Sequence, residues 1–335
     1  MKILVKTVVI IIIALIALLS LHHDFTLMMI ARRLQAETPL QTTLNYFHYT
    51  RNQILFAKYG IGPIYDHSLG PLERGFGYCD QQSNFFVLLC EYGGIPARML
   101  MLECDHGISC HTLAESKIGK TWGIFDLTYG IYFHHPGDST RLIPKNELEQ
   151  VVLDSIFNGL YQTRFYTDGH TESISRIRQI RIAVTRWLFP GWLLIHHPLQ
   201  DAYLSLRSLK LDTPARHYLK ARHYSISCRY TDAFHHYQTL IGQSQSDHYP
   251  DRTLYQTAYL HHLRHSDSTA DSLCRQLIKH YPHSSFKSDT YWLIYQICPT
   301  SSHRDSLLKW ADNWDSHWER YHHFRYKDSN PKEQP

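Results

Sequence analysis

The sequence lacks clusters of basic residues and carries little net charge. Its 335 residues include 34 Lys and Arg against 30 Asp and Glu, a formal net charge of +4, and these charges are spread along the chain. Proteins that hold nucleic acid electrostatically gather Lys and Arg on one face or in one run, so we expect no nucleic-acid partner. With 43% hydrophobic residues, the chain is long enough for two domains with cores of their own.

The cysteines lack the regular spacing of a disulfide scaffold. There are seven, an odd number, so at least one thiol stays free. Cys104 and Cys110 flank a short turn and could form a disulfide, but we favour the alternative that they are not bridged. His261 and His265 have ligand spacing but no evident third ligand, and no carboxylate-rich calcium loop is visible. We therefore expect no metal and no cofactor.

The amino terminus contains a long apolar run. Residues 7–21, TVVIIIIALIALLSL, follow Lys2 and Lys6. A cleavable export signal ends in small residues at alternate positions, whereas this run closes with LLSLHHD and has no lipid-accepting cysteine. We favour an uncleaved transmembrane helix over residues 1–22, with a cleaved signal as the alternative. The two lysines then predict a single-pass protein of a bacterial inner membrane with the rest of the chain in the periplasm.

The next part of the chain alternates between helical and strand periodicity. Residues 39–60 have the apolar spacing of a helix, residues 61–77 are rich in turn formers, and a second helix is predicted from Cys79 to Tyr92. Three strand-length segments follow, which are ARMLMLEC (97–104), ISCHTLAES (108–116) and KTWGIFDLTY (120–129). We expect an α+β fold in which an antiparallel meander packs against the helix that begins at Cys79.

The position of Cys79 gives its thiol a chemical role. Unpaired N–H groups and the dipole at a helix start stabilise an anion, so we expect Cys79 to carry thiolate at neutral pH. Such a nucleophile needs a base within hydrogen-bond reach and an acid that orients the base. His111 on the second strand and Asp126 on the third can both point toward the helix. These three residues are the predicted catalytic set.

The stretch GYCDQQSNFFVLLCEYGGIPAR (77–98), followed by SCHTLAES and TWGIFDLTYG, resembles the transglutaminase-like superfamily. The resemblance covers about residues 75–130 and departs from the family at Ser83, where the family often has Ala. It implies that Cys79 is the nucleophile, His111 the base and Asp126 the orienting acid. The implied activity is that of a cysteine protease, amidase or acyltransferase that forms a thioester, within a domain of residues 38–150.

The resemblance does not identify every part of the site. The backbone N–H of Cys79 supplies one donor to the oxyanion of the intermediate, and a second donor usually comes from an earlier side chain. Gln53, Asn52 and Tyr78 are the three alternatives.

Residues 151–212 are predicted to form linker helices. The stretch 173–199 intersperses arginines with apolar residues and carries Trp187 and Trp192. Two alternatives are open, an amphipathic helix lying on the membrane surface and a helix packed on the catalytic core.

Residues 213–330 contain a repeat that resembles tetratricopeptide units. Three residues recur at an offset of 37, and Tyr-Pro follows each unit. The recurring residues are Ala233, Leu240 and Ile241, repeated as Ala270, Leu277 and Ile278. We expect stacked helical hairpins that fold independently of the core, with a cap from Ser288 to Phe324 and a surface for a protein partner.

Two functions follow. The first is a membrane-anchored thiol hydrolase or acyltransferase acting on polypeptide or peptidoglycan-like amides. The alternative is a non-catalytic envelope scaffold or assembly protein that binds partners through the helical repeats. The intact set of Cys79, His111 and Asp126 favours the enzyme.

Overall fold

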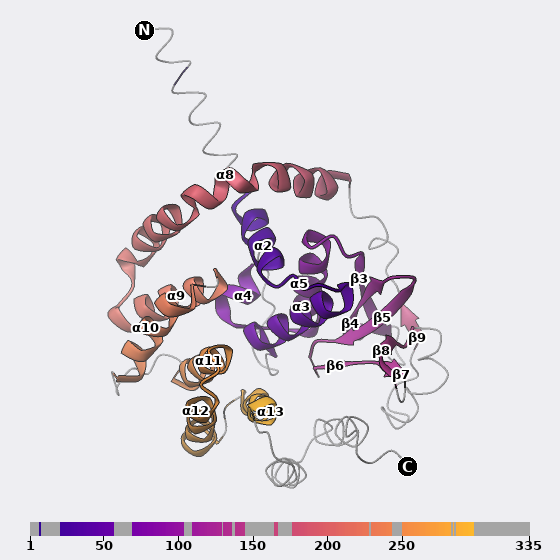
Figure 1. Cartoon of the computed structure of the whole chain (residues 1–335). Helices are drawn as coiled ribbons and strands as arrows, with labels where there is room; N and C mark the ends of the chain where they lie inside the picture. The colour runs from indigo at the N-terminus through magenta and orange to yellow at the C-terminus, as the bar shows by residue number, and fades with distance from the viewer. Residues whose placement is uncertain are drawn as a thin grey trace.

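The protein is an α+β core surrounded on two sides by helices (Figure 1). The computed structural model describes residues 7, 21–56, 69–103, 109–128, 130–135, 138–144, 164–166, 176–227, 229–242, 250–282, 284 and 286–297.

A five-stranded antiparallel sheet forms one layer of the core. Its strand order is β6-β5-β4-β3-β9, so the three strands predicted from the sequence lie side by side as a meander. The strands are β3 (Ala97–Glu103), β4 (Ser109–Ile118), β5 (Thr121–Asp126), β6 (Ile131–Tyr132) and β9 (Arg164–Tyr166). The prediction of helices throughout residues 151–212 is therefore wrong at β9, which pairs with β3 at the edge of the sheet. A two-stranded ribbon of β7 (His134–His135) and β8 (Asp138–Leu142) follows β6.

Helix α5 (Cys79–Tyr92) packs on this sheet and has the predicted bounds. Its buried face carries Phe86, whose ring lies 5.2 Å from that of Phe125 on β5 and 6.5 Å from that of Phe47. Phe47 belongs to α3 (Pro39–Gln53), so three aromatic rings join two helices to the sheet. Such clusters stabilise by burial and by edge-to-face ring contacts.

Helix α3 is shorter than the sequence predicted. It ends at Gln53 instead of Gly60, and β1 (Leu55–Phe56) follows at once and pairs in parallel with β2 (Phe76–Gly77). The prediction counted Ile54 and Leu55 as part of the helix. Apolar spacing cannot distinguish the last turn of a helix from a short apolar strand that follows it directly. Between the two strands lies the short helix α4 (Gly70–Arg74), in a segment expected to consist of turns.

Helix α2 (His22–Arg33) belongs to the core, although the predicted domain starts only at residue 38. Eight consecutive residues, from Asp24 to Ala31, are buried in the described structure. The ring of Phe25 stacks on that of Trp192 at 4.5 Å. Trp192 lies on α8 (Arg176–Arg207), a 32-residue helix that contains Pro190 and Pro198.

Helix α8 runs along the outside of the molecule with α2 on its inner side (Figure 1). Two ion pairs attach its first half to the core: Arg178 contacts Glu91 at 3.2 Å, and Arg181 contacts Asp24. One face of the helix thus packs on the core, as the second of the two predicted alternatives requires. A short 3-10 helix, η1 (Ser208–Lys210), continues it.

The helices that follow pack pairwise in chain order. They are α9 (Thr213–Ile226), α10 (Tyr230–Gly242), α11 (Pro250–Leu263), α12 (Asp267–His280) and α13 (Lys287–Ile297). Ala233 on α10 and Ala270 on α12 are both fully buried, each on the second helix of a packed pair. This arrangement is compatible with tetratricopeptide-like repeats. The helices do not form a separate unit, however, because α9, α11 and α13 make buried polar contacts with the core.

Three predictions fall outside the described residues. The apolar run of residues 7–21 is described only at its two ends, Cys104 of the proposed bridge is not included, and neither is the cap beyond Ile297. Within the described part of the chain, no helix combines the length and the apolar character needed to cross a membrane.

Candidate active site

Cys79 is the first residue of α5, immediately after the extended residue Tyr78. The side chain of Gln81 reaches back, and its Oε1 accepts a hydrogen bond from the backbone N–H of Tyr78 at 3.1 Å. This contact satisfies a backbone donor just before the helix and fixes the point at which the chain becomes helical. The thiol therefore lies at the positive end of the helix dipole, as predicted.

His111 and Asp126 come together on adjacent strands. Ala114 on β4 pairs with Phe125 on β5, and continuing this register puts Asp126 opposite Leu113. The side chain of Leu113 shares a face of the sheet with that of His111, two residues earlier. Nε2 of His111 lies 2.8 Å from Oδ2 of Asp126, a carboxylate that is fully buried.

The charges around His111 favour its protonated form. Burial lowers the pKa of His111, but the charge and hydrogen bond of Asp126, together with a hydrogen bond and the charge of Cys79, raise it to about 10. The imidazole is thus a cation at neutral pH. Because Nε2 faces Asp126, Nδ1 is the ring nitrogen available to the Cys79 sulfur, and the three predicted residues form one connected set.

Comparison with known proteins agrees with this geometry. Residues 28–127 match the family model described as the transglutaminase-like superfamily. These residues form a transglutaminase-like domain. No match was found among curated proteins or among solved structures. The matched segment begins inside α2 and ends one residue after Asp126, so it contains the whole Cys79, His111 and Asp126 set.

Two buried side chains fix the start of α5 within the transglutaminase-like domain. Ser83, the residue that departs from the family pattern, donates a hydrogen bond to the carbonyl oxygen of Thr112 at 3.0 Å. Gln82 donates to the carbonyl of Ile54 at 2.7 Å and accepts from the hydroxyl of Thr128 at 2.9 Å. Gln82 thereby links helix α5 to the turn that follows Asp126. The sequence suggested only that it suits the first turn of a helix.

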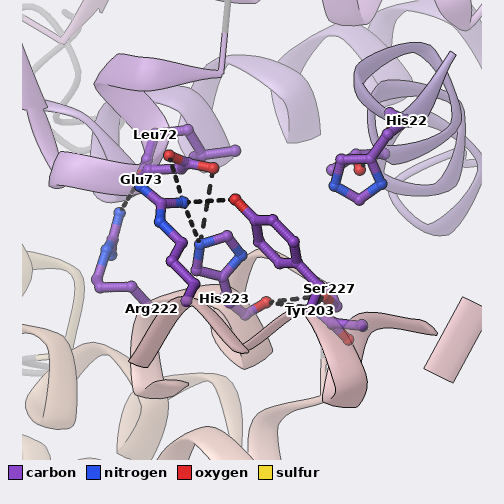
Figure 2. Close-up of polar contacts among 10 residues, drawn as sticks. His22, Leu72, Glu73, Tyr203, Arg222, His223 and Ser227 are labelled. Atoms are coloured by element: carbon purple, nitrogen blue, oxygen red, sulfur yellow. Dashed lines mark hydrogen bonds and ion pairs between the residues drawn. The ribbon is translucent and has the colours of Figure 1, made fainter. Parts of the chain in front are cut away.

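Arg222 on α9 is the least expected residue near the site, because it is fully buried and lies outside the transglutaminase-like domain. Its guanidinium donates to the side chain and to the backbone carbonyl of Gln53, each at 3.0 Å, and to the carbonyl of Leu72. Figure 2 shows Arg222 reaching from α9 toward Leu72. The guanidinium also lies against Gly75, where an added Cβ would approach it to 3.2 Å. Arg222 thus holds both ends of the segment that leads to Cys79.

A second group of polar contacts surrounds Glu73 (Figure 2). One carboxylate oxygen accepts a hydrogen bond from Arg207 of α8 at 3.3 Å, and the other lies 3.6 Å from Nε2 of His223. Burial lowers the pKa of His223 to about 4, against the opposing effect of Glu73. His223 is therefore neutral at pH 7, and Arg207 supplies the positive charge that balances Glu73.

Arg51 forms another buried link to the helical region. It lies at the end of α3, is 1% exposed, and pairs with Asp289 of α13 at 3.5 Å. Its stem packs over Gly130, where an added Cβ would collide with the guanidinium group. Gly130 has φ +69 and lies in the turn after β5, so Arg51 supports the turn that follows Asp126.

Two of the three predicted oxyanion donors face the C-terminal helices. Gln53 contacts Arg222, and Oδ1 of Asn52 accepts a hydrogen bond from the hydroxyl of Tyr255 on α11 at 3.3 Å. Both side chains are buried in this interface. Tyr78 packs at the edge of the apolar cluster that joins Phe76 to α11, α12 and α13.

Proposed function

We propose that the protein is a thiol enzyme that transfers or hydrolyses acyl groups of amides, with Cys79 as nucleophile. The observation that supports this is the position of His111, which contacts Asp126 at 2.8 Å and hydrogen-bonds Cys79 at the start of α5. Among the cysteines whose surroundings are described, Cys79 is partly exposed, whereas Cys90 and Cys274 are buried. Burial raises the pKa of Cys90 well above its ordinary value, which makes it a core residue and not a nucleophile.

The first half of the reaction forms a thioester. The Cys79 thiolate attacks the carbonyl carbon of the substrate, and the negative charge moves to the carbonyl oxygen, where the backbone N–H of Cys79 stabilises it. The C–N bond then breaks as the His111 imidazolium gives its proton to the departing nitrogen. Asp126 holds the ring throughout by accepting a hydrogen bond from Nε2–H.

The second half returns the enzyme to its starting state. His111, now neutral, takes a proton from a water molecule or an amine, which attacks the thioester carbonyl. The C–S bond breaks, the thiolate is restored beside the imidazolium, and an acid or a new amide leaves. Water gives a protease or amidase, and an amine gives an acyltransferase.

The test ranks the cysteines by their rate of reaction with iodoacetamide at about pH 6.5, read by mass spectrometry. We expect Cys79 to react fastest, with Cys90 and Cys274 as internal controls, and His111→Ala to slow Cys79 alone. His280→Ala, an exposed residue on α12, is the matched control and should change nothing. If Cys79 reacts no faster than Cys274 and is indifferent to His111, the enzyme proposal is wrong. The alternative, a scaffold that binds partners through α9 to α13, then takes its place.

We further propose that the substrates are polypeptide or peptidoglycan-like amides outside the cytoplasm and that the C-terminal helices bind a protein partner. The apolar run of residues 7–21, preceded by two lysines, supports this location. A reporter that is active only in the periplasm, fused after Pro335, should be active. A silent periplasmic reporter together with an active cytoplasmic one would contradict the location and leave the chemistry of Cys79 unaffected.

A further inference from the structure

The exposed apolar side chains of the described structure are concentrated on α8 and on η1, which continues it. Ten large apolar side chains are exposed, and eight of them lie between residues 180 and 209. The eight are Ile180, Val184, Trp187, Leu193, Leu199, Tyr203, Leu206 and Leu209. Trp187 is 80% exposed, and Leu206 and Leu209 are 70% and 71% exposed. Scattered single apolar residues are normal on a protein surface, but a concentration of this kind marks an interaction site.

Six of these residues form two groups that each have the spacing of one helix face. Ile180, Val184 and Trp187 are four and three residues apart, and so are Leu199, Tyr203 and Leu206 further along α8. The side of the helix that faces the core is buried, with Trp192 and Phe189 packed on α2. We call the eight exposed residues the outer α8 face. Helix α8 runs along the outside of the molecule (Figure 1), and the side chains of the outer α8 face are exposed.

The charge around the outer α8 face is positive. Between residues 173 and 210 the sequence has five arginines, at 176, 178, 181, 186 and 207, together with Lys210 and a single acidic residue, Asp201. Arg186 and Lys210 are exposed, and Arg178 and Arg181 are 41% and 48% exposed although they pair with acidic residues of the core. An apolar helix face carrying Trp and Tyr and bordered by Arg and Lys has the composition of a helix that lies in the headgroup layer of an anionic bilayer.

The chain enters the structure beside this helix. The ring of His22, at the start of α2, lies 6.0 Å from the ring of Trp192 and 6.0 Å from that of Tyr203 on α8. The apolar run of residues 7–21, in which Thr7 and Ser20 are the polar members, directly precedes His22 in the sequence. The first residue after the apolar run in the sequence therefore lies beside Tyr203 of the outer α8 face.

We propose that the outer α8 face lies on the surface of an anionic lipid bilayer. The apolar side chains enter the interface, and Arg186 and Lys210 contact lipid phosphates. This orientation fixes the transglutaminase-like domain relative to the membrane. The proposal rests on α8 alone and does not depend on catalysis by Cys79. A second copy of the chain is the competing occupant, and the basic border argues against it because two such faces would repel each other.

The test places the full chain in vesicles of phosphatidylethanolamine and phosphatidylglycerol that contain a phospholipid with a photoactivatable acyl chain. After irradiation, mass spectrometry identifies the labelled peptides. We expect label on residues 176–210 in addition to the amino terminus, and little on α11 and α12. The combined variant Trp187→Glu, Leu206→Glu and Leu209→Glu should lose the label on α8 and keep its melting temperature, because all three side chains are exposed.

The matched control carries Ile241→Glu and Leu263→Glu, the two exposed apolar residues outside the outer α8 face, each 36% exposed. It should be labelled on α8 like the wild type. Label confined to residues before His22 would overturn the proposal, and so would chemical cross-links joining the α8 helices of two copies. Trp187→Ser alone keeps the test valid if the triple variant folds poorly, since it should lower the label on its own peptide.

Discussion

The two helical regions beside the transglutaminase-like domain contact it through different chemistry. Helix α8 packs with aromatic rings, such as Trp192 on Phe25, and with ion pairs whose arginines stay half exposed. The region from α9 to α13 instead inserts buried polar groups, above all Arg222, and supplies Asp289 as the partner of Arg51. Ring stacking tolerates small shifts, whereas a guanidinium bonded to defined carbonyl oxygens does not.

This difference suggests separate tasks for the two regions. A contact that tolerates small shifts is enough for α8, because its exposed side is not part of the core. A directional contact is needed where a segment must be held in place, and Arg222 holds the segment between α3 and α5 that leads to Cys79. Substitutions in the catalytic set, at the arginine interface and on exposed surface should therefore separate into three classes of effect.

The largest effect is expected inside the catalytic set. Asp126→Asn removes the negative charge that orients the His111 ring and favours its protonated form. We expect turnover to fall by about 10⁴ by analogy with other triads. The melting temperature should change little relative to this loss, because the amide has the same shape as the carboxylate. Steady-state kinetics together with a thermal melt checks the prediction. A tenfold loss or less would mean that Asp126 does not orient His111.

The pH dependence of turnover sharpens the same point. The pKa of His111 is raised to about 10, so the imidazolium that protonates the leaving group is present at neutral pH and is lost as the pH rises through 10. The alkaline limb of the wild-type profile should therefore lie near pH 10. Asp126→Asn removes the main cause of the rise and should move the limb down toward the ordinary value of about 6.5. An unchanged limb in the variant would assign it to another group.

The next effect is expected at the arginine interface. Arg222→Met leaves the carbonyls of Gln53 and Leu72 without their donor, and we expect the free energy of unfolding to fall by about 3 kcal/mol. Turnover should fall too, since the segment before Cys79 loses its support. Urea unfolding and kinetics measure the two effects, with Lys279→Met on the exposed face of α12 as control. A variant as stable and as active as the control would remove the distinction between the two regions.

A smaller effect is expected at Gly75, which ends α4 with φ +82. An alanine there must adopt a left-handed conformation and push the Arg222 guanidinium, which would lie 3.2 Å from the new Cβ. We expect Gly75→Ala to cost about 1–2 kcal/mol of unfolding free energy. In the background of Arg222→Met the steric part should disappear, so the two costs should not add. Strict additivity would show that the two residues do not interact.

The smallest effect is expected on exposed surface. Arg275 pairs with Asp271 at 2.7 Å across one turn of α12, with 46% of its side chain exposed. Such pairs contribute about 0.3–0.5 kcal/mol and weaken with salt. Arg275→Ala should therefore leave turnover unchanged. In urea unfolding it should lower the free energy of unfolding by no more than this amount. A larger loss of unfolding free energy would show that Arg275 makes a further stabilising contact on this face of α12.

Local sequence was sufficient to predict that Cys79, His111 and Asp126 lie together, and to predict the helix and strands that carry them. Cys79, His111 and Asp126 were found because a helix start and two alternating strands place them within about fifty residues of each other. Helix α5 and strands β3 to β5 follow the predicted segments within a few residues, since their periodicity is set by one buried face.

Long-range contacts explain what the sequence did not predict. Nothing in the neighbourhood of Arg222 shows that it is buried, because its acceptors lie 150 and 169 residues earlier in the chain. Helix α2 looks like the continuation of an apolar amino terminus until its packing under Trp192 is seen. Strand β9 has only three residues and is defined by its pairing with β3, which no periodicity records.

The distance of Arg222 from its acceptors has a consequence for the order in which the protein matures. Synthesis runs from the amino end, so Gln53 and Leu72 leave the ribosome long before Arg222 is added. The interval between the synthesis of Arg51 and that of its partner Asp289 is longer still. A chain that ends before α9 contains the complete set of Cys79, His111 and Asp126 but lacks the contacts that hold the segment leading to the thiol. The nascent protein therefore carries Cys79 without these supporting contacts, and the last of them forms only after Asp289 has been added.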